Sequence, residues 1–208
     1  MHQPGTTTKP IRFSLASLML MTIVAAVLLG WWRDHQRMRR ELDRIRNPGP
    51  RWGTAEVTGQ PDTQRYGDIR TAWASKQPDN QPEWLILEYQ RSVKPSAVWI
   101  YETYNPGAVN RVTVFDSKGN EHDAWLGEDP LIGAKGGIAK LKLNGNAAQI
   151  ATRRIKIYLD SPNFAGWNEI DAVGLIDDRG SKQWAERAKS SSSYGDDSNY
   201  SQYILQLL

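Results

Sequence analysis

The sequence contains no cysteine and only three histidines among its 208 residues. Without cysteine it cannot form a disulfide, a thiolate nucleophile, a cysteine-ligated metal centre or a cysteine-linked lipid anchor. Only His122 lies after residue 50, and no nucleophile–base pattern accompanies it. Neither an HExxH zinc motif nor a GxxxxGK[ST] phosphate-binding loop is present, since residues 133–137 read GAKGG. These absences predict that the protein is not an enzyme.

Charge is missing from one long stretch near the N-terminus, residues 13–32, which Arg12 and Arg33 bracket. A helix of that length spans roughly 30 Å, the thickness of the hydrocarbon core of a bilayer. The stretch therefore predicts a single-pass transmembrane helix, preceded by an N-terminal tail of residues 1–12. A cleaved signal peptide is the alternative, but the Gly-Trp-Trp sequence at residues 30–32 is a poor cleavage site. An uncleaved signal anchor in the lipid bilayer is the favoured interpretation.

Residues 33–50 predict a basic helical stalk followed by a linker. Met38, Leu42 and Ile45 fall on one helical face, which would suit a short dimerising coiled coil. The alternative is a solvated helix whose arginines contact acidic lipid headgroups, and two heptads favour this simpler interpretation. The sequence NPGP at residues 47–50 ends the helix.

The basic character of the chain belongs to this N-terminal part. Residues 1–50 carry 8 Lys and Arg against 3 Asp and Glu, whereas residues 51–208 carry 18 against 20. A slightly acidic domain argues against nucleic acid as a partner. Six of the arginines follow residue 32, and by the positive-inside rule they favour a cytoplasmic location for the C-terminal domain.

Residues 51–178 predict one all-β domain, because short segments of alternating apolar and polar residues recur between turn sequences. Seven or eight strands at this spacing favour an antiparallel sandwich or jelly roll. The clearest segments are residues 84–89, 97–104, 109–115, 121–125, 138–143, 153–160 and 168–176. Residues 179–208 form a C-terminal extension, in which residues 182–189 predict a strand or short helix. The polar stretch 190–201 predicts disorder. The apolar end at 203–208 predicts packing on a sheet edge, and the alternative is a short docking peptide.

Two separated motifs resemble a known family. Residues 101–109 read YETYNPGAV and residues 167–173 read WNEIDAV. They are similar to the hallmarks of a discoidin-like sandwich family that includes a domain of pappalysin and part of an F-box/leucine-rich-repeat protein. The resemblance implies a galactose-binding-like jelly roll without catalytic machinery. It also implies a location outside the cytoplasm, which we prefer over the location that the arginine count favours.

In related jelly rolls, an acid near the last strand often helps to hold a structural calcium ion. Glu169 and Asp171 alternate along the last predicted strand and should project from one face, where Asp62 and Asp68 could complete an oxygen-ligand site. The alternative is that these carboxylates bind backbone amides at a sheet end, or pair with Arg153 or Arg154.

Trp73, Trp125 and Trp167 lie in or beside predicted loops and are candidates for stacking against a sugar; the alternative for each is packing at the rim of the sandwich. Glu102 on a central strand is expected either to bind a ligand or to pin the turn at residues 105–107. The favoured function is a membrane-anchored, non-catalytic binding module for carbohydrate or protein. The alternative is a structural or assembly subunit that docks on partner proteins and binds no small molecule.

Overall fold

The computed structural model describes residues 15–46 and 51–195. The chain divides into two compact units, Met1–Pro48 and Gly49–Leu208. The first contains the helix α1 (Leu15–Arg46) and the second contains all the strands. The predicted architecture of antiparallel β-sheets with one N-terminal helix is confirmed.

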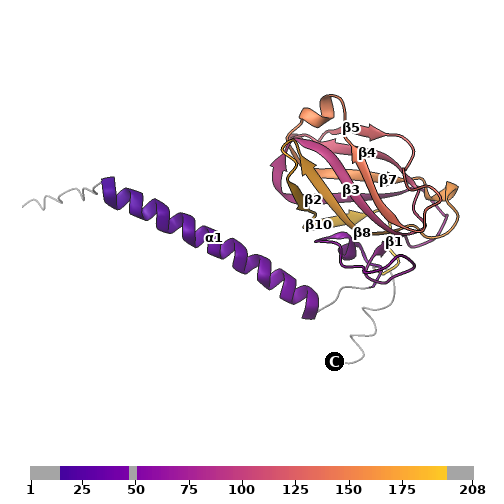
Figure 1. The fold of residues 1–208 in the computed structure, drawn as a ribbon, viewed down its shortest axis with the longest axis horizontal. Coiled ribbons are helices and arrows are strands. Elements are labelled where there is room, and N and C mark those ends of the chain that lie inside the picture. Colours follow the sequence, from indigo (N-terminus) through magenta and orange to yellow (C-terminus); the bar gives the residue numbers. More distant parts are fainter. Residues whose placement is uncertain (1–14, 47–50, 196–208) are drawn as a thin grey trace, which may run out of the picture. The chain divides into compact units, whose positions relative to one another are not determined.

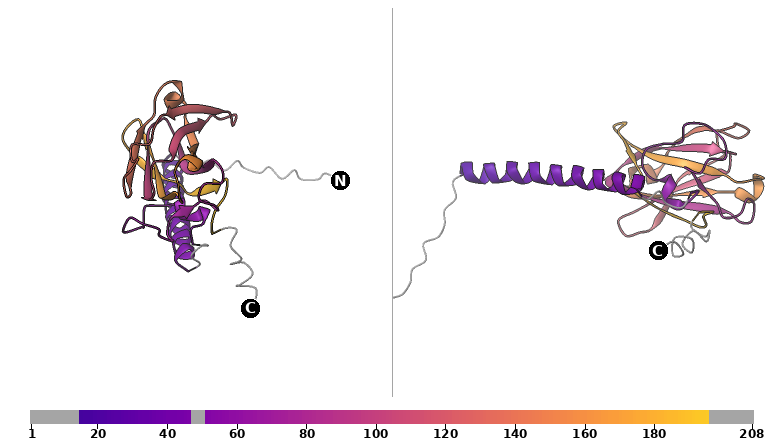
Figure 2. Two further views of the ribbon diagram at one scale, coloured as in Figure 1. Left: turned by 90° about the vertical axis from the view of Figure 1, so that its right-hand side faces the viewer. Right: turned by 90° about the horizontal axis from the view of Figure 1, so that it is seen from below.

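Helix α1 is continuous over 32 residues (Figure 2), so the helical conformation predicted after residue 32 is confirmed as far as Arg46. Its side chains between residues 19 and 34 are exposed on every face. Among the helices of residues 15–46 and 51–195, none is both long and apolar enough to cross a membrane. The transmembrane helix predicted over residues 13–32, of which 13 and 14 lie outside the described residues, therefore has no support from the structure.

Two five-stranded sheets form the second unit (Figure 1). One sheet has the order β1 (Trp73–Ala74), β8 (Glu169–Asp177), β3 (Pro95–Tyr104) and β6 (Gly137–Lys142), with β9 (Lys182–Trp184) also paired to β8. The other has the order β10 (Arg187–Ser190), β2 (Glu83–Val93), β7 (Thr152–Leu159), β4 (Val109–Phe115) and β5 (Glu121–Leu126). Every pairing is antiparallel, as the alternating pattern predicted. Short 3-10 helices cover Thr54–Val57, Asn146–Gln149 and Ser161–Asn163.

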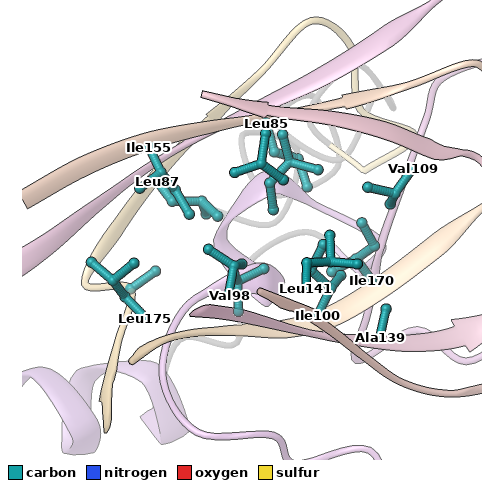
Figure 3. Packing of buried hydrophobic residues seen from close by; sticks show 14 of the residues in the cluster. Leu85, Leu87, Val98, Ile100, Val109, Ala139, Leu141, Ile155, Ile170 and Leu175 are labelled. Atoms are coloured by element: carbon teal, nitrogen blue, oxygen red, sulfur yellow. The ribbon is translucent and has the colours of Figure 1, made fainter. Parts of the chain in front are cut away.

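The hydrophobic core lies between the two sheets, where alternate residues of each strand meet. Figure 3 shows Leu85, Leu87 and Ile155 of β2 and β7 on one side of this core. Val98 and Ile100 of β3 lie on the other side. Side chains of a strand alternate between the two faces of a sheet, so the sequence alternation identifies the buried face directly.

The sandwich extends beyond the predicted boundary at residue 178. Both β9 and β10 belong to it, since β9 pairs with β8 and β10 pairs with β2. The serines that follow are fixed as well, because the hydroxyls of Ser191 and Ser192 both donate to the buried carboxylate of Glu83. The predicted disorder from residue 190 is thus wrong as far as residue 195. The apolar end at 203–208 lies outside the described residues.

Replacing Ile100 with alanine is expected to lower the free energy of unfolding by about 2–5 kcal/mol, because it leaves a cavity in the core. Ile138 on the neighbouring strand β6 is the matched control: it is 37% exposed, whereas Ile100 is fully buried. Its replacement should cost about 0.5 kcal/mol or little more. Urea unfolding of the full-length chain, followed by tryptophan fluorescence, measures both. Equal losses at the two positions would contradict this placement of the core.

Candidate functional site

A small cavity of about 130 Å³ opens where β8 begins and β1 ends. Three aromatic rings, two carboxyl groups and one small side chain line it: Trp52, Trp167, Tyr194, Asp68, Glu169 and Ala74. These residues come from four separate parts of the sequence. The cavity is therefore a product of the tertiary fold rather than of a local motif.

Strand pairing places two of these residues together. Ala74 of β1 lies opposite Glu169 of β8 in the antiparallel ladder. Trp167 precedes the same strand by two residues, and the loop that carries Asp68 leads into β1. The loop is fixed to β8 by a hydrogen bond in which the Ile69 amide donates to Glu169 Oε2 at 3.0 Å.

The two carboxyl groups are held close to one another at this cavity. Glu169 is only 2% exposed. Burial, and next to it the neighbouring Asp68, raise the pKa of Glu169 to about 8, although the hydrogen bond from Ile69 opposes the change. Asp68 Oδ1 accepts a hydrogen bond from the indole Nε1–H of Trp52 at 3.0 Å. Within the part of the chain that the structure describes, no lysine or arginine lines the cavity.

The aromatic rings meet edge to face. Tyr194 stands nearly perpendicular to Trp52, with centroids 5.7 Å apart and an angle of 76° between the ring planes. It stands perpendicular to Trp167 too, at 6.3 Å and 89°. Trp167 is 38% exposed and Tyr194 is 48% exposed. A ligand in solution can therefore reach both rings.

Trp52 adopts a left-handed backbone conformation, with φ of 60°. An L residue pays roughly 1–2 kcal/mol for this conformation, so its surroundings must hold it there. The Trp52 amide donates to the Arg70 carbonyl at 3.1 Å. Its own carbonyl accepts from the Ser193 hydroxyl at 3.1 Å and from the Ala74 and Gly195 amides at 3.4 and 3.3 Å. Backbone strain of this kind is concentrated at functional sites.

Only one of the three predicted sugar-stacking tryptophans lines the cavity, namely Trp167. Trp73 is fully buried, and its indole donates to the Ser192 carbonyl at 3.0 Å, so its proposed role in ligand stacking is wrong. Trp125 packs partly buried against the core and lies outside the cavity. Trp125 thus has the alternative role given for these tryptophans, packing within the sandwich. The physical reason is that sequence proximity to a loop does not fix the direction of a side chain.

The four predicted calcium ligands come from two facing segments, residues 62–68 and strand β8, and form two pairs. Asp68 lies beside Glu169, and Asp171 Oδ1 and Oδ2 accept from the amides of Asp62 and Thr63, both at 3.4 Å. Glu169 and Asp171 do therefore project from one face, toward residues 62–69. Within residues 15–46 and 51–195, no three or more His, Cys, Asp or Glu side chains converge as a metal site would require.

The alternative interpretation for these carboxylates was binding to backbone amides or pairing with arginine. The structure shows the first, because Glu169 and Asp171 both accept from amides of the facing segment. It places the guanidinium of Arg154 elsewhere, 4.1 Å above the ring of Phe115. Structural calcium stays a prediction.

A second pair of buried carboxyl groups serves the turn at residues 105–107. Glu102 Oε2 accepts from the Gly107 amide at 3.3 Å, which confirms that Glu102 pins this turn. Asp129 accepts from the amides of Val109 at 3.2 Å and Leu131 at 2.9 Å. Burial, reinforced by the charge of Asp129, raises the pKa of Glu102 to about 9.

Sequence reasoning missed Trp52 and Tyr194. Neither lies in a recognisable motif, and Tyr194 follows a run of serines that reads as disordered. The sequence does contain one signal that residues near Tyr194 are ordered, namely Ser191 and Ser192. A buried acid such as Glu83 requires hydroxyl or amide donors, and these two serines supply them.

Comparison of the chain with protein-family models and with curated proteins found no match. The resemblance to the discoidin-like family therefore rests on the sequence motifs alone.

The free energy of unfolding is expected to fall as the pH rises from about 5 to about 8. An unfolded glutamate has a pKa of about 4.3, so the folded state holds more protons than the unfolded state over this range. Glu169 and Glu102, with pKa values raised to about 8 and about 9, are the main cause. Asp171, whose pKa burial raises to about 6, contributes at the acidic end of this range. Urea unfolding at a series of pH values measures the slope.

The variant Glu169→Gln should make this pH dependence shallower, because it removes one of the three carboxyl groups whose pKa is raised into this range. Glu128→Gln, at an exposed position, is the matched control and should leave the slope unchanged. A slope that is the same in Glu169→Gln as in the unmodified chain would contradict the assignment.

Proposed function

We propose that the protein is a membrane-tethered, non-catalytic binding module whose cavity at the start of β8 receives a carbohydrate or protein ligand. The observation that carries this proposal is the cavity itself, in which exposed rings of Trp167 and Tyr194 lie beside the carboxyl groups of Asp68 and Glu169. Aromatic rings with a few fixed polar groups are the usual lining of ligand sites.

The membrane tether is supported by the sequence of residues 13–32, which has no charge, and by the exposure of α1. Large apolar side chains of residues 19–29 are exposed by 48% to 64% on all sides of the helix. A helix that is apolar all round is stable in water only when lipid or protein covers it. Trp31 and Trp32 stand at the end of the run, where aromatic side chains favour the headgroup region.

A non-catalytic role is supported by the surroundings of His122, the one histidine of residues 51–208. Its ring Nε2 lies 3.0 Å from Asp116 Oδ2. The other oxygen of Asp116 accepts from the amides of Lys118 and Asn120, both at 2.9 Å, so that this carboxylate stabilises a hairpin turn. The contact is explained by the turn and requires no substrate.

The sandwich is assigned in this proposal to the galactose-binding-like jelly rolls of discoidin-like type, on the motifs at residues 101–109 and 167–173. The second of these motifs contributes Trp167 and Glu169 to the cavity. Members of the wider galactose-binding-like fold are mostly extracytoplasmic, which supports a location of the domain outside the cytoplasm.

The tether predicts that the full-length chain sediments with membranes and resists extraction by alkaline carbonate. The double variant Val24→Arg and Leu28→Arg should release it, because each arginine at mid-helix costs about 2.5–3.5 kcal/mol of insertion free energy. Met38→Arg, in the stalk, is the matched control and should stay with the membranes. A freely soluble unmodified chain would refute the tether.

The binding role predicts that the full-length chain retains a glycan from an array or crosslinks to a partner protein. Trp167→Ala should weaken that binding at least tenfold, because it removes an exposed ring of the cavity. Trp125→Ala removes an equally large ring that lies outside the cavity and should leave binding unchanged. Binding that is insensitive to Trp167, or no binding of either ligand class, would refute the proposed site.

A further inference from the structure

We infer that the cavity selects a compact alkylammonium group, carried by a small organic cation without a neighbouring anion. This inference rests on the binding function proposed for the same cavity and specifies the chemistry of its ligand. It follows from the charge, the ring geometry and the size of the cavity.

The cavity presents carboxyl groups without a positive partner. Asp68 and Glu169 both line it, and among residues 15–46 and 51–195 no lysine or arginine does. Among the described residues, the ion pairs of the sandwich lie elsewhere, at Asp123 and Glu88. Two carboxyl groups side by side favour a ligand that brings a positive charge, because a bound cation lowers the pKa that burial and Asp68 raise at Glu169 and lets both carboxyl groups ionise.

The aromatic rings of the cavity also differ from other rings of the sandwich in lacking a cation. Elsewhere the chain supplies its own: Lys182 Nζ lies 4.0 Å from the ring centroid of Trp99, and Lys156 Nζ lies 5.0 Å from that of Trp84. Among the described residues, no such contact involves Trp52, Trp167 or Tyr194. The attraction of a ring for a cation is thus available to a ligand.

The arrangement of the rings suits a rounded group better than a flat one. Tyr194 stands at 76° to Trp52 and at 89° to Trp167, so the rings form walls that meet at steep angles. A sugar stacks its flat face on one exposed ring, whereas a methylated ammonium contacts several rings at once. Such aromatic enclosures are how proteins bind quaternary ammonium ions.

The size of the cavity also favours a small group. Its volume of about 130 Å³ holds roughly four water molecules, since each occupies about 30 Å³ in the liquid. Pockets for drug-sized ligands measure about 300–1,000 Å³. The cavity therefore accepts a group of a few heavy atoms. A phosphate next to the ammonium, as in a phosphocholine headgroup, would meet repulsion from Asp68 and Glu169.

The test compares choline with 3,3-dimethylbutan-1-ol, which has the same shape and no charge. The full-length chain is kept in an uncharged polyoxyethylene detergent, and binding is followed by nuclear magnetic resonance on the indole N–H of Trp52, assigned with Trp52→Phe. Choline should shift this signal and bind at least tenfold more tightly than the uncharged alcohol. Phosphocholine should bind more weakly than choline.

Variants locate the binding. Glu169→Gln, which keeps the shape of the side chain, and Trp167→Ala should each weaken choline binding at least tenfold. Asp171→Asn, on the same strand but outside the cavity, and Trp125→Ala are the matched controls and should bind choline normally. Tyr194→Phe keeps the ring and should also bind.

Equal binding of choline and the uncharged alcohol, or loss of choline binding in Asp171→Asn as severe as in Glu169→Gln, would overturn the inference. Binding of a neutral sugar at the Trp52 signal without binding of choline would overturn it and leave the proposed binding function intact. Tighter binding of phosphocholine would overturn the restriction to cations without an anion and indicate a lipid headgroup. Binding of a trimethyl-lysine peptide together with choline would support the ammonium site and identify a protein ligand.

Discussion

The backbone of Ala74 joins the two ends of the sandwich. Its amide donates to the carbonyl of Trp52, and its carbonyl accepts from the amide of Tyr194 at 2.9 Å. In the ladder it faces Glu169 of β8. One residue of a two-residue strand thus sets the positions of the first ring, the last ring and a buried carboxyl group of the cavity.

Buried acids perform two different tasks in this domain. Glu83, Glu102 and Asp171 fasten segments that have no strand partner, by accepting from serine hydroxyls or from backbone amides. A buried acid is costly unless donors satisfy it. Glu83 thus fixes the serine run, Glu102 fixes the turn at 105–107, and Asp171 fixes residues 62–63. Glu169 also accepts an amide, yet it lies at an open cavity beside Asp68. Its position is therefore the one that a ligand can use.

Most of the sheet architecture follows from the sequence, because alternation of apolar residues reports directly on the buried face. Residues 153–160 and 84–89 are examples in which the predicted strands are central strands β7 and β2. Strand β1 escapes this method, since two residues are too few to show a period. Strands β9 and β10 fall where the sequence predicted a single strand or short helix over residues 182–189, because three or four residues do not distinguish the two. Of the cavity, Trp167, Asp68 and Glu169 were predicted. Trp52 and Tyr194 were not, because their positions depend on contacts with Ala74 that no local pattern encodes.

The charge distribution supports a cavity for cations on independent grounds. The excess of basic residues lies in residues 1–50, whereas residues 51–208 carry two more acidic than basic residues. An acidic domain raises the local concentration of cations, and a concave site with apolar walls concentrates the field further. A cavity of about 130 Å³ makes few contacts, so a ligand held there alone binds weakly. Attachment of many copies to one membrane compensates for this weakness when the ligand is multivalent, because each later contact forms at a high effective concentration. The proposed tether thus offsets the weak binding expected of so small a cavity.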